Sequence, residues 1–91
     1  MLTTDNGTEK AVDFFVTPKI RESDNKVNWL VYRRSLNVCV EAASDPAAAI
    51  AKAMRLAEFC ALGGQAAQVH VRDAGDAHWR TVCKKSPIAQ R

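Results

Sequence analysis

The sequence lacks the long apolar segments of membrane proteins and the leader pattern of secreted proteins. No apolar run among its 91 residues approaches the roughly 18 residues that span a bilayer. The first residues contain no basic stretch followed by an apolar run, which is the pattern of a secretion signal. We therefore expect a cytoplasmic protein with no membrane partner.

Cysteine is scarce, and its spacing excludes the common cysteine-based frameworks. The three cysteines, Cys39, Cys60 and Cys83, form no C-x-x-C pair and have no histidine close to them in sequence. An odd number cannot pair completely into disulfides, and isolated cysteines do not supply the three or four ligands of a zinc site. We expect reduced, partly buried cysteines and no metal or other cofactor.

Signatures of catalysis are also missing. The sequence contains no G-x-S-x-G, no P-loop, no H-E-x-x-H and no pair of carboxylates at a spacing suited to acid–base chemistry. Cys60 and Cys83 lie in apolar surroundings with no base near them in sequence, so a structural role is predicted for both. The prediction is a non-enzymatic protein without catalytic residues and without a small-molecule ligand.

What the sequence does contain is the composition of a globular domain. Hydrophobic residues make up 47% and charged residues 25% of the chain. A length of 91 residues is near the lower size at which one hydrophobic core suffices, so a single domain over residues 1–91 is expected. The polar segments 1–10 and 84–91 are expected to be flexible ends of an ordered core at about 12–83.

The clearest structural pattern is one helix with both ends marked. Asp45 can accept hydrogen bonds from the first turn, and Pro46 occupies a position where a missing N–H costs nothing. Gly63 is predicted to end the helix in the left-handed conformation. The residues expected on the core stripe of this helix are Ile50, Ala53, Met54, Ala57 and Ala61.

Short alternating segments on both sides of this helix predict strands. They comprise residues 12–17, 27–34 and 37–41 before the helix, and 67–72 and 76–83 after it. This order predicts an α+β fold, in which a small antiparallel sheet of four to five strands carries the helix on one face. Trp29 is expected to anchor the core under the helix.

The run Asp73-Ala74-Gly75 predicts a three-residue hairpin loop between the last two strands. That register pairs Arg72 with Asp76, His70 with His78 and Val69 with Trp79. Trp79 would then point toward the helix, and the opposite face would have no aromatic platform on which a nucleic-acid base could stack.

Several of these segments resemble a small family of uncharacterised bacterial proteins, catalogued as domain of unknown function 2188. The resemblance covers about residues 14 to 83 and implies a compact helix-on-sheet domain with no known activity. The chain departs from the family at Asp73-Ala74-Gly75, where the family prefers Asp-Gly, and in a longer connection between the first two strands. The residues that carry the resemblance are Phe15-Val16-Thr17-Pro18, Trp29-Leu30-Val31, Ala48, Ile50, Ala53 and Ala57 of the helix, and Val69-His70-Val71-Arg72-Asp73-Ala74-Gly75.

Two large apolar residues of the helix, Leu56 and Phe59, fall outside its core stripe. Exposed apolar clusters usually mark contact surfaces, so the leading hypothesis is association with a protein partner or with a second copy, through this side of the helix or a sheet edge. A twofold homodimer would be the commonest form. The alternative is that the loops flanking the helix cover both side chains.

The C-terminal third is basic, because residues 61–91 contain two acids (Asp73, Asp76) and five bases (Arg72, Arg80, Lys84, Lys85, Arg91). An alternative function is weak, sequence-independent binding of nucleic acid through the last hairpin. A solvated polar face would give the same count. Two histidines without a third ligand do not predict a zinc site. The candidate nucleic-acid contacts are His70, Arg72, His78, Arg80, Lys84 and Lys85.

Overall fold

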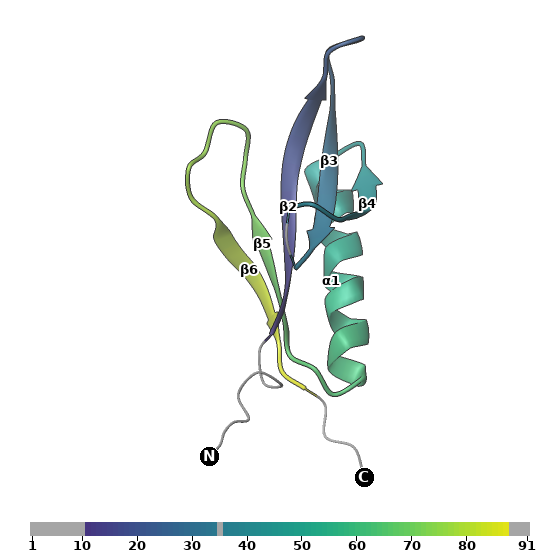
Figure 1. Ribbon diagram of the computed structural model, residues 1–91, viewed down its shortest axis with the longest axis vertical. Helices are drawn as coiled ribbons and strands as arrows, with labels where there is room; N and C mark the ends of the chain where they lie inside the picture. Colours follow the sequence, from purple (N-terminus) through teal and green to yellow (C-terminus); the bar gives the residue numbers. More distant parts are fainter. Residues whose placement is uncertain (1–10, 35, 88–91) are drawn as a thin grey trace.

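The computed structural model describes residues 11–34 and 36–87, which form one five-stranded sheet with a single helix packed on one face (Figure 1). The predicted α+β class and element order are confirmed. The expected flexible ends at 1–10 and 88–91 lie outside the described residues, whereas residues 84 and 85 belong to the last strand. The elements are β2 (Val12–Arg21), β3 (Lys26–Arg33), β4 (Cys39–Ala43), α1 (Pro46–Leu62), β5 (Ala67–Val71) and β6 (Arg80–Lys85).

The sheet is mixed, so the expectation of a purely antiparallel sheet was wrong. Its strand order is β4-β3-β2-β5-β6, and the pair β2 and β5 in the middle is parallel. The other three pairs are antiparallel. The reason lies in the connection, because β4 runs in the direction of β2 and α1 then carries the chain back over the sheet. A strand that follows such a helical crossover runs parallel to the strand before it.

The core lies between α1 and the face of the sheet that it covers, called here the covered face. The helix residues that are buried in it are all alanines, namely Ala49, Ala53, Ala57 and Ala61. Because an alanine side chain is a single methyl group, the helix backbone approaches the sheet closely and the larger strand residues fill the space. The strand side chains of this core, all at most 1% exposed, are Val12, Phe14, Val16, Val31, Ala67, Val69 and Val71.

Most of the predicted core stripe of the helix is confirmed. Ile50 packs against the buried cluster only in part, and Met54 is 38% exposed, so its assignment to the stripe was wrong. Ala49 lies on the buried side in its place. Trp29, which was expected to anchor the core under the helix, is only partly buried and packs against the core at its border.

The two helix caps differ in how well the sequence predicted them. The Asp45 carboxylate accepts a hydrogen bond of 2.8 Å from the Ala48 N–H, which confirms the N-cap. Gly63 has a φ of −84°, and the left-handed residue is Gly64 with a φ of +87°. The Gly63 N–H still donates to the carbonyl oxygens of Phe59 and Cys60, so the chain reverses one residue later than predicted.

The hairpin formed by β2 and β3 is longer than predicted, because β2 continues through Pro18. The Val12 N–H donates to Ala66 and the Val16 carbonyl accepts from Arg72, so every second residue of β2 turns its backbone groups toward β5. Pro18 has this orientation too, but β5 has already ended, so its missing N–H removes no sheet bond. Beyond this point the hairpin projects as a two-stranded ribbon (Figure 1).

Candidate functional site

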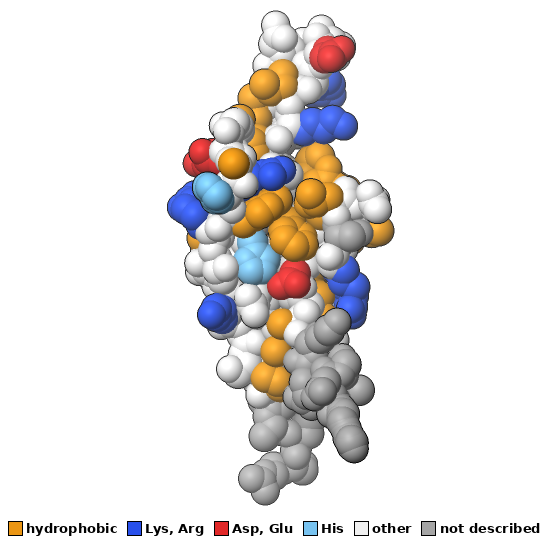
Figure 2. All heavy atoms as spheres, turned by 60° about the vertical axis from the view of Figure 1, so that its left-hand side comes forward, with side chains coloured by type: hydrophobic (Ala, Val, Ile, Leu, Met, Phe, Trp, Pro, Cys, Tyr) orange, Lys and Arg blue, Asp and Glu red, His pale blue; other side chains and the backbone are white. Residues whose placement is uncertain are grey.

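The face of the sheet opposite α1, called here the open face, has no helix over it in the described part of the chain. Figure 2 shows apolar side chains gathered in the middle of this face, with a histidine beside them and basic side chains around them. The strand register places Phe15, Leu30 and Tyr32 here, each partly exposed. A partly exposed apolar patch with a charged border is the composition of a binding surface.

An aromatic cluster occupies the centre of the open face. The ring of Phe15 lies 5.0 Å from that of Trp79 in an edge-to-face arrangement and 5.3 Å from that of His70. The guanidinium carbon of Arg72 lies 4.3 Å from the centre of the Trp79 ring, within the range of a cation–π contact. We use the name aromatic cluster for Phe15, His70, Trp79 and Arg72.

His70 is held on both sides of its ring. Its Nε2 atom lies 2.9 Å from Asp13 Oδ1, and its Nδ1 atom lies 2.9 Å from Thr81 Oγ1. In the neutral ring Nε2–H donates to Asp13 and the Thr81 hydroxyl donates to Nδ1, whereas the protonated ring donates to both. These bonds join β2, β5 and β6 across the open face, so the cluster is positioned before any ligand arrives.

Positive charge borders the cluster. The strand register places Lys19, Arg21, Lys26 and Lys84 on the open face. The one carboxylate among the strand residues of this face, Asp13, already contacts His70, and Arg21 forms an ion pair of 3.2 Å with Asp24 at the hairpin tip. With Arg72, the face therefore has an excess of positive charge that favours an anionic ligand.

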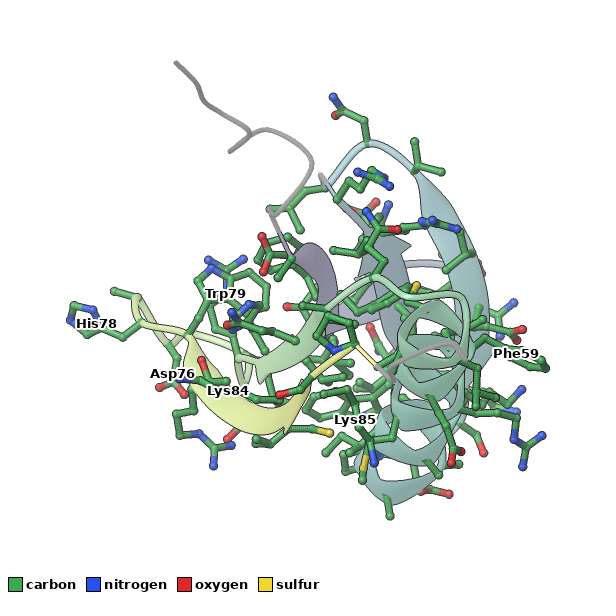
Figure 3. All side chains as sticks on the ribbon, turned by 90° about the horizontal axis from the view of Figure 1, so that it is seen from below. Phe59, Asp76, His78, Trp79, Lys84 and Lys85 are labelled. Atoms are coloured by element: carbon green, nitrogen blue, oxygen red, sulfur yellow. The ribbon has the colours of Figure 1, made fainter. Side chains whose placement is uncertain are left out.

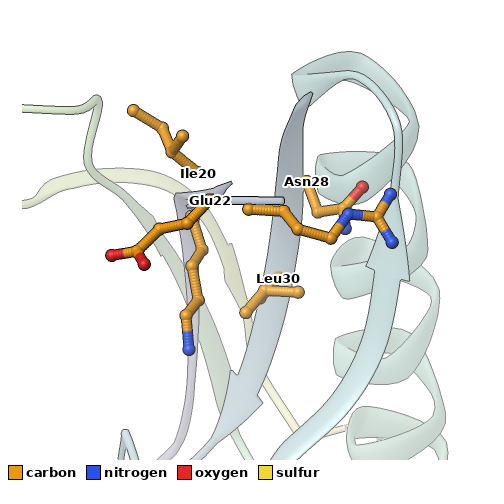
Figure 4. A pocket seen from close by; sticks show the side chains of 6 residues that line it. Ile20, Glu22, Asn28 and Leu30 are labelled. Atoms are coloured by element: carbon orange, nitrogen blue, oxygen red, sulfur yellow. The ribbon is translucent and has the colours of Figure 1, made fainter. Parts of the chain in front are cut away.

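Two shallow hollows continue from the cluster along the ribbon. The hollow shown in Figure 4 has a volume of about 430 Å³. A wider groove of about 610 Å³ separates residues 17–20 of β2 from the connection at residues 72–77. Both hollows are lined by cations and carboxylates, namely Lys19, Arg21 and Glu22 around the first and Lys19, Arg72, Asp73 and Asp76 around the second. The first hollow has two cations and one carboxylate, so it is the one whose lining favours an anion. The residues around the first hollow are Lys19, Ile20, Arg21, Glu22, Asn28 and Leu30.

The predicted register of the last hairpin was wrong. The connection comprises residues 72–79, and β6 begins at Arg80, which pairs with Val71. His70 is opposite Thr81, and a bulge follows Val69. Trp79 consequently packs on Phe15 on the open face. The conclusion that this face has no aromatic platform was also wrong.

The structure brings together only part of the predicted basic hairpin. His70, Arg72 and Lys84 belong to the open face. Arg80 contacts Asp73 at 3.8 Å, and Lys85 is opposite Ala67, which faces the helix. His78 is exposed in the connection and lies away from the others (Figure 3).

Two central residues of the site were missed by sequence reasoning. Phe15 could have been found, because side chains alternate along a strand and Phe14 and Phe15 must point to opposite faces. Trp79 had no local signal, since its direction depends on the length of the connection before β6.

The two predicted helix contacts have different surroundings. Leu56 is partly buried and packs against the core, so part of it serves the fold. Phe59 is 66% exposed and points away from the sheet in Figure 3.

Other chemistries have little support in the described residues. Residues 11–34 and 36–87 contain no group of three or more His, Cys, Asp or Glu side chains able to hold a metal ion. The cysteines are free, with Cys39 exposed and the other two partly buried. No helix in this part of the chain has the length and apolarity needed to cross a membrane.

Comparisons of the chain with protein-family models, with curated proteins and with solved structures found no match. The resemblance to the domain of unknown function 2188 stays a prediction from its sequence segments.

Proposed function

We propose that this protein is a non-enzymatic domain that binds single-stranded nucleic acid on the open face of its sheet. The observation that carries the proposal is the aromatic cluster, in which Phe15, Trp79 and Arg72 are in contact on a face with excess positive charge. Aromatic side chains and positive charge are the two components of surfaces that hold single strands without reading their sequence.

The chemistry divides between the bases and the backbone of the ligand. Bases stack on the partly exposed rings of Phe15 and Trp79, because every base has a π-face. Lys19, Arg21 and Lys84 contact phosphates and displace counterions, which makes the affinity fall as salt rises. A duplex keeps its bases stacked on one another, so single strands bind more tightly.

The test is fluorescence anisotropy of a labelled oligonucleotide of eight thymidines, titrated with protein at two salt concentrations. Trp79→Ala and Phe15→Ala each remove a stacking surface, and stacking is worth about 1–3 kcal/mol per base, so each weakens binding roughly 5- to 150-fold. Lys19→Gln weakens binding less and lowers the slope of log affinity against log salt by about one.

Phe59→Ser is the matched control, because it removes an exposed aromatic ring on the opposite side of the molecule. It leaves oligonucleotide binding unchanged. Circular dichroism establishes that each variant is folded. Wild-type protein that does not bind at low salt, or Trp79→Ala that binds as tightly as wild type, refutes the proposal.

Association with a protein is the second candidate function. It is favoured by the exposure of Phe59 and Leu62, which are 66% and 52% exposed at the C-terminal end of α1. Light scattering of wild type and of Phe59→Ser tests it in the form of self-association, since the variant then has the lower mass at equal concentration. Equal masses at every concentration contradict a role for Phe59.

A further inference from the structure

We infer that the outer side of α1 pairs antiparallel with α1 of a second copy to form a twofold homodimer. This inference rests on the second candidate function, association with a protein, and does not depend on nucleic-acid binding. The surface concerned is the side of the helix turned away from the buried alanines. Its residues are Ala51, Arg55, Glu58, Phe59 and Leu62, called here the outer seam, and all five are exposed.

Four residues of the outer seam lie in one line along the helix. Ala51, Arg55, Glu58 and Leu62 follow one another at intervals of four, three and four residues. Alternating intervals of three and four keep one line of side chains facing a neighbouring helix. Phe59 borders this line.

A hollow of about 120 Å³ lies on the outer seam, lined by Arg55, Glu58, Phe59 and Leu62. These four residues have the positions i, i+3, i+4 and i+7. Four residues at these positions form the hole that receives one side chain of a facing helix in knobs-into-holes packing. The hollow is therefore of the kind that receives one side chain of a facing helix, and its wall contains one cation, Arg55, and one anion, Glu58.

The outer seam is complementary to itself when the second helix runs in the opposite direction. A twofold axis opposite the midpoint between Leu56 and Ala57 places Arg55 of each copy opposite Glu58 of the other. The same axis places each Leu62 opposite the small side chain of Ala51. Both kinds of contact occur twice, as a twofold contact requires.

The parallel arrangement lacks this complementarity. It places each residue beside its own copy, so the two Arg55 side chains meet and the two Glu58 side chains meet. Like charges at such positions repel one another. Charge thus selects the antiparallel homodimer.

The experiment measures the dimer dissociation constant by sedimentation equilibrium of the full chain. Arg55→Glu places two carboxylates opposite each other on both sides of the twofold axis and weakens the dimer at least tenfold. Glu58→Arg does the same with two guanidinium groups. The double variant Arg55→Glu/Glu58→Arg restores the opposite charges in reverse order and returns to within about threefold of wild type.

Ala51→Glu is a second test of the dimer. It buries a carboxylate against Leu62 of the second copy and therefore also weakens the dimer. Lys26→Glu, a charge reversal at the hairpin, is the control and leaves dimerisation unchanged. All substituted residues are exposed, so the substitutions leave the packing of the core intact.

Two results overturn the inference. A wild-type chain that remains monomeric at millimolar concentration refutes the dimer and self-association together. A dimer whose dissociation constant is the same in Arg55→Glu and in wild type refutes the outer seam but leaves self-association through another surface standing. Oligonucleotide binding by the Arg55→Glu variant equals that of wild type in either case.

Discussion

Phe14 and Phe15 are neighbours in β2, yet they belong to two different regions of the molecule. Phe14 is 1% exposed on the covered face, among valines and the alanines of α1. Phe15 is partly exposed on the open face, between His70 and Trp79. Among the described residues no polar or charged side chain is buried, so the buried core on the covered face is wholly apolar.

The comparison separates stability from binding. The covered face gains its free energy from apolar area removed from water, which is proportional to burial and insensitive to salt. The open face is held by directional contacts, such as the bonds of His70 to Asp13 and Thr81. Such contacts contribute little net stability because water competes for them, but they fix the direction of side chains that can meet a ligand.

The largest effect that tests this comparison is expected from Phe14→Ala set against Phe15→Ala. Phe14→Ala leaves a cavity in the core and lowers the free energy of unfolding by about 3–5 kcal/mol. Phe15→Ala removes a ring that water already reaches, so it has a clearly smaller effect. Urea denaturation followed by circular dichroism measures both. Equal losses of unfolding free energy in the two variants would show that both faces contribute to stability in the same way.

The close approach of α1 to the sheet predicts the next effect. Ala57→Leu forces extra methyl and methylene groups into the contact and lowers the free energy of unfolding by about 1–3 kcal/mol. Ala47→Leu makes the same change at an exposed position of the helix and alters stability by less than about 0.5 kcal/mol. The midpoint of urea denaturation should therefore be lower for Ala57→Leu than for Ala47→Leu. An Ala57→Leu variant with the free energy of unfolding of wild type would mean that the contact between α1 and the covered face accommodates a larger side chain.

The C-terminal end of the helix gives a smaller effect. Gly64→Ala places a methyl group on a residue with a φ of +87° and costs about 1 kcal/mol, although no atom lies within 4 Å of the added group. At Gly63 the φ is ordinary, and a methyl group would lie 3.5 Å from the nearest atom, the Cys60 carbonyl oxygen, which is ordinary van der Waals contact, so Gly63→Ala is close to neutral. Thermal melts of both variants measure the difference. If Gly63→Ala lowered the melting temperature more than Gly64→Ala, Gly63 would be the left-handed residue, as the sequence predicted.

The smallest effect is expected on the open face. Thr81→Val keeps the shape of a β-branched residue but removes the hydroxyl that bonds to His70 Nδ1. The free energy of unfolding falls by about 0.5–1 kcal/mol, because water can replace an exposed hydrogen bond. The ring signals of His70 in NMR spectra broaden as the ring gains freedom. A loss above about 2 kcal/mol would show that this hydrogen bond contributes substantially to stability. It would then contradict the conclusion that contacts of the open face contribute little to the free energy of unfolding.

Local signals in the sequence were sufficient for the helix and for the existence of the strands. The Asp45 cap and the helix over residues 46–62 follow from interactions between residues near in the chain, and the packing of Trp29 against the core follows from alternation. The site was harder to predict. His70 and Arg72 lie on the face opposite the helix, as the predicted hairpin placed them. Trp79 was assigned to the wrong face, because a single error of register reverses the direction of a side chain.

The sequence by itself determined which segments are helix and strand, because capping, hydrophobic period and turn residues act over a few neighbouring positions. Only the tertiary structure decided that β5 pairs in parallel with β2, that Pro18 lies inside a strand and that Phe15, His70 and Trp79 meet. These outcomes join residues more than fifty positions apart in the chain, such as Asp13 and His70. Their contact depends on the packing of the whole sheet under α1, and no local pattern encodes it.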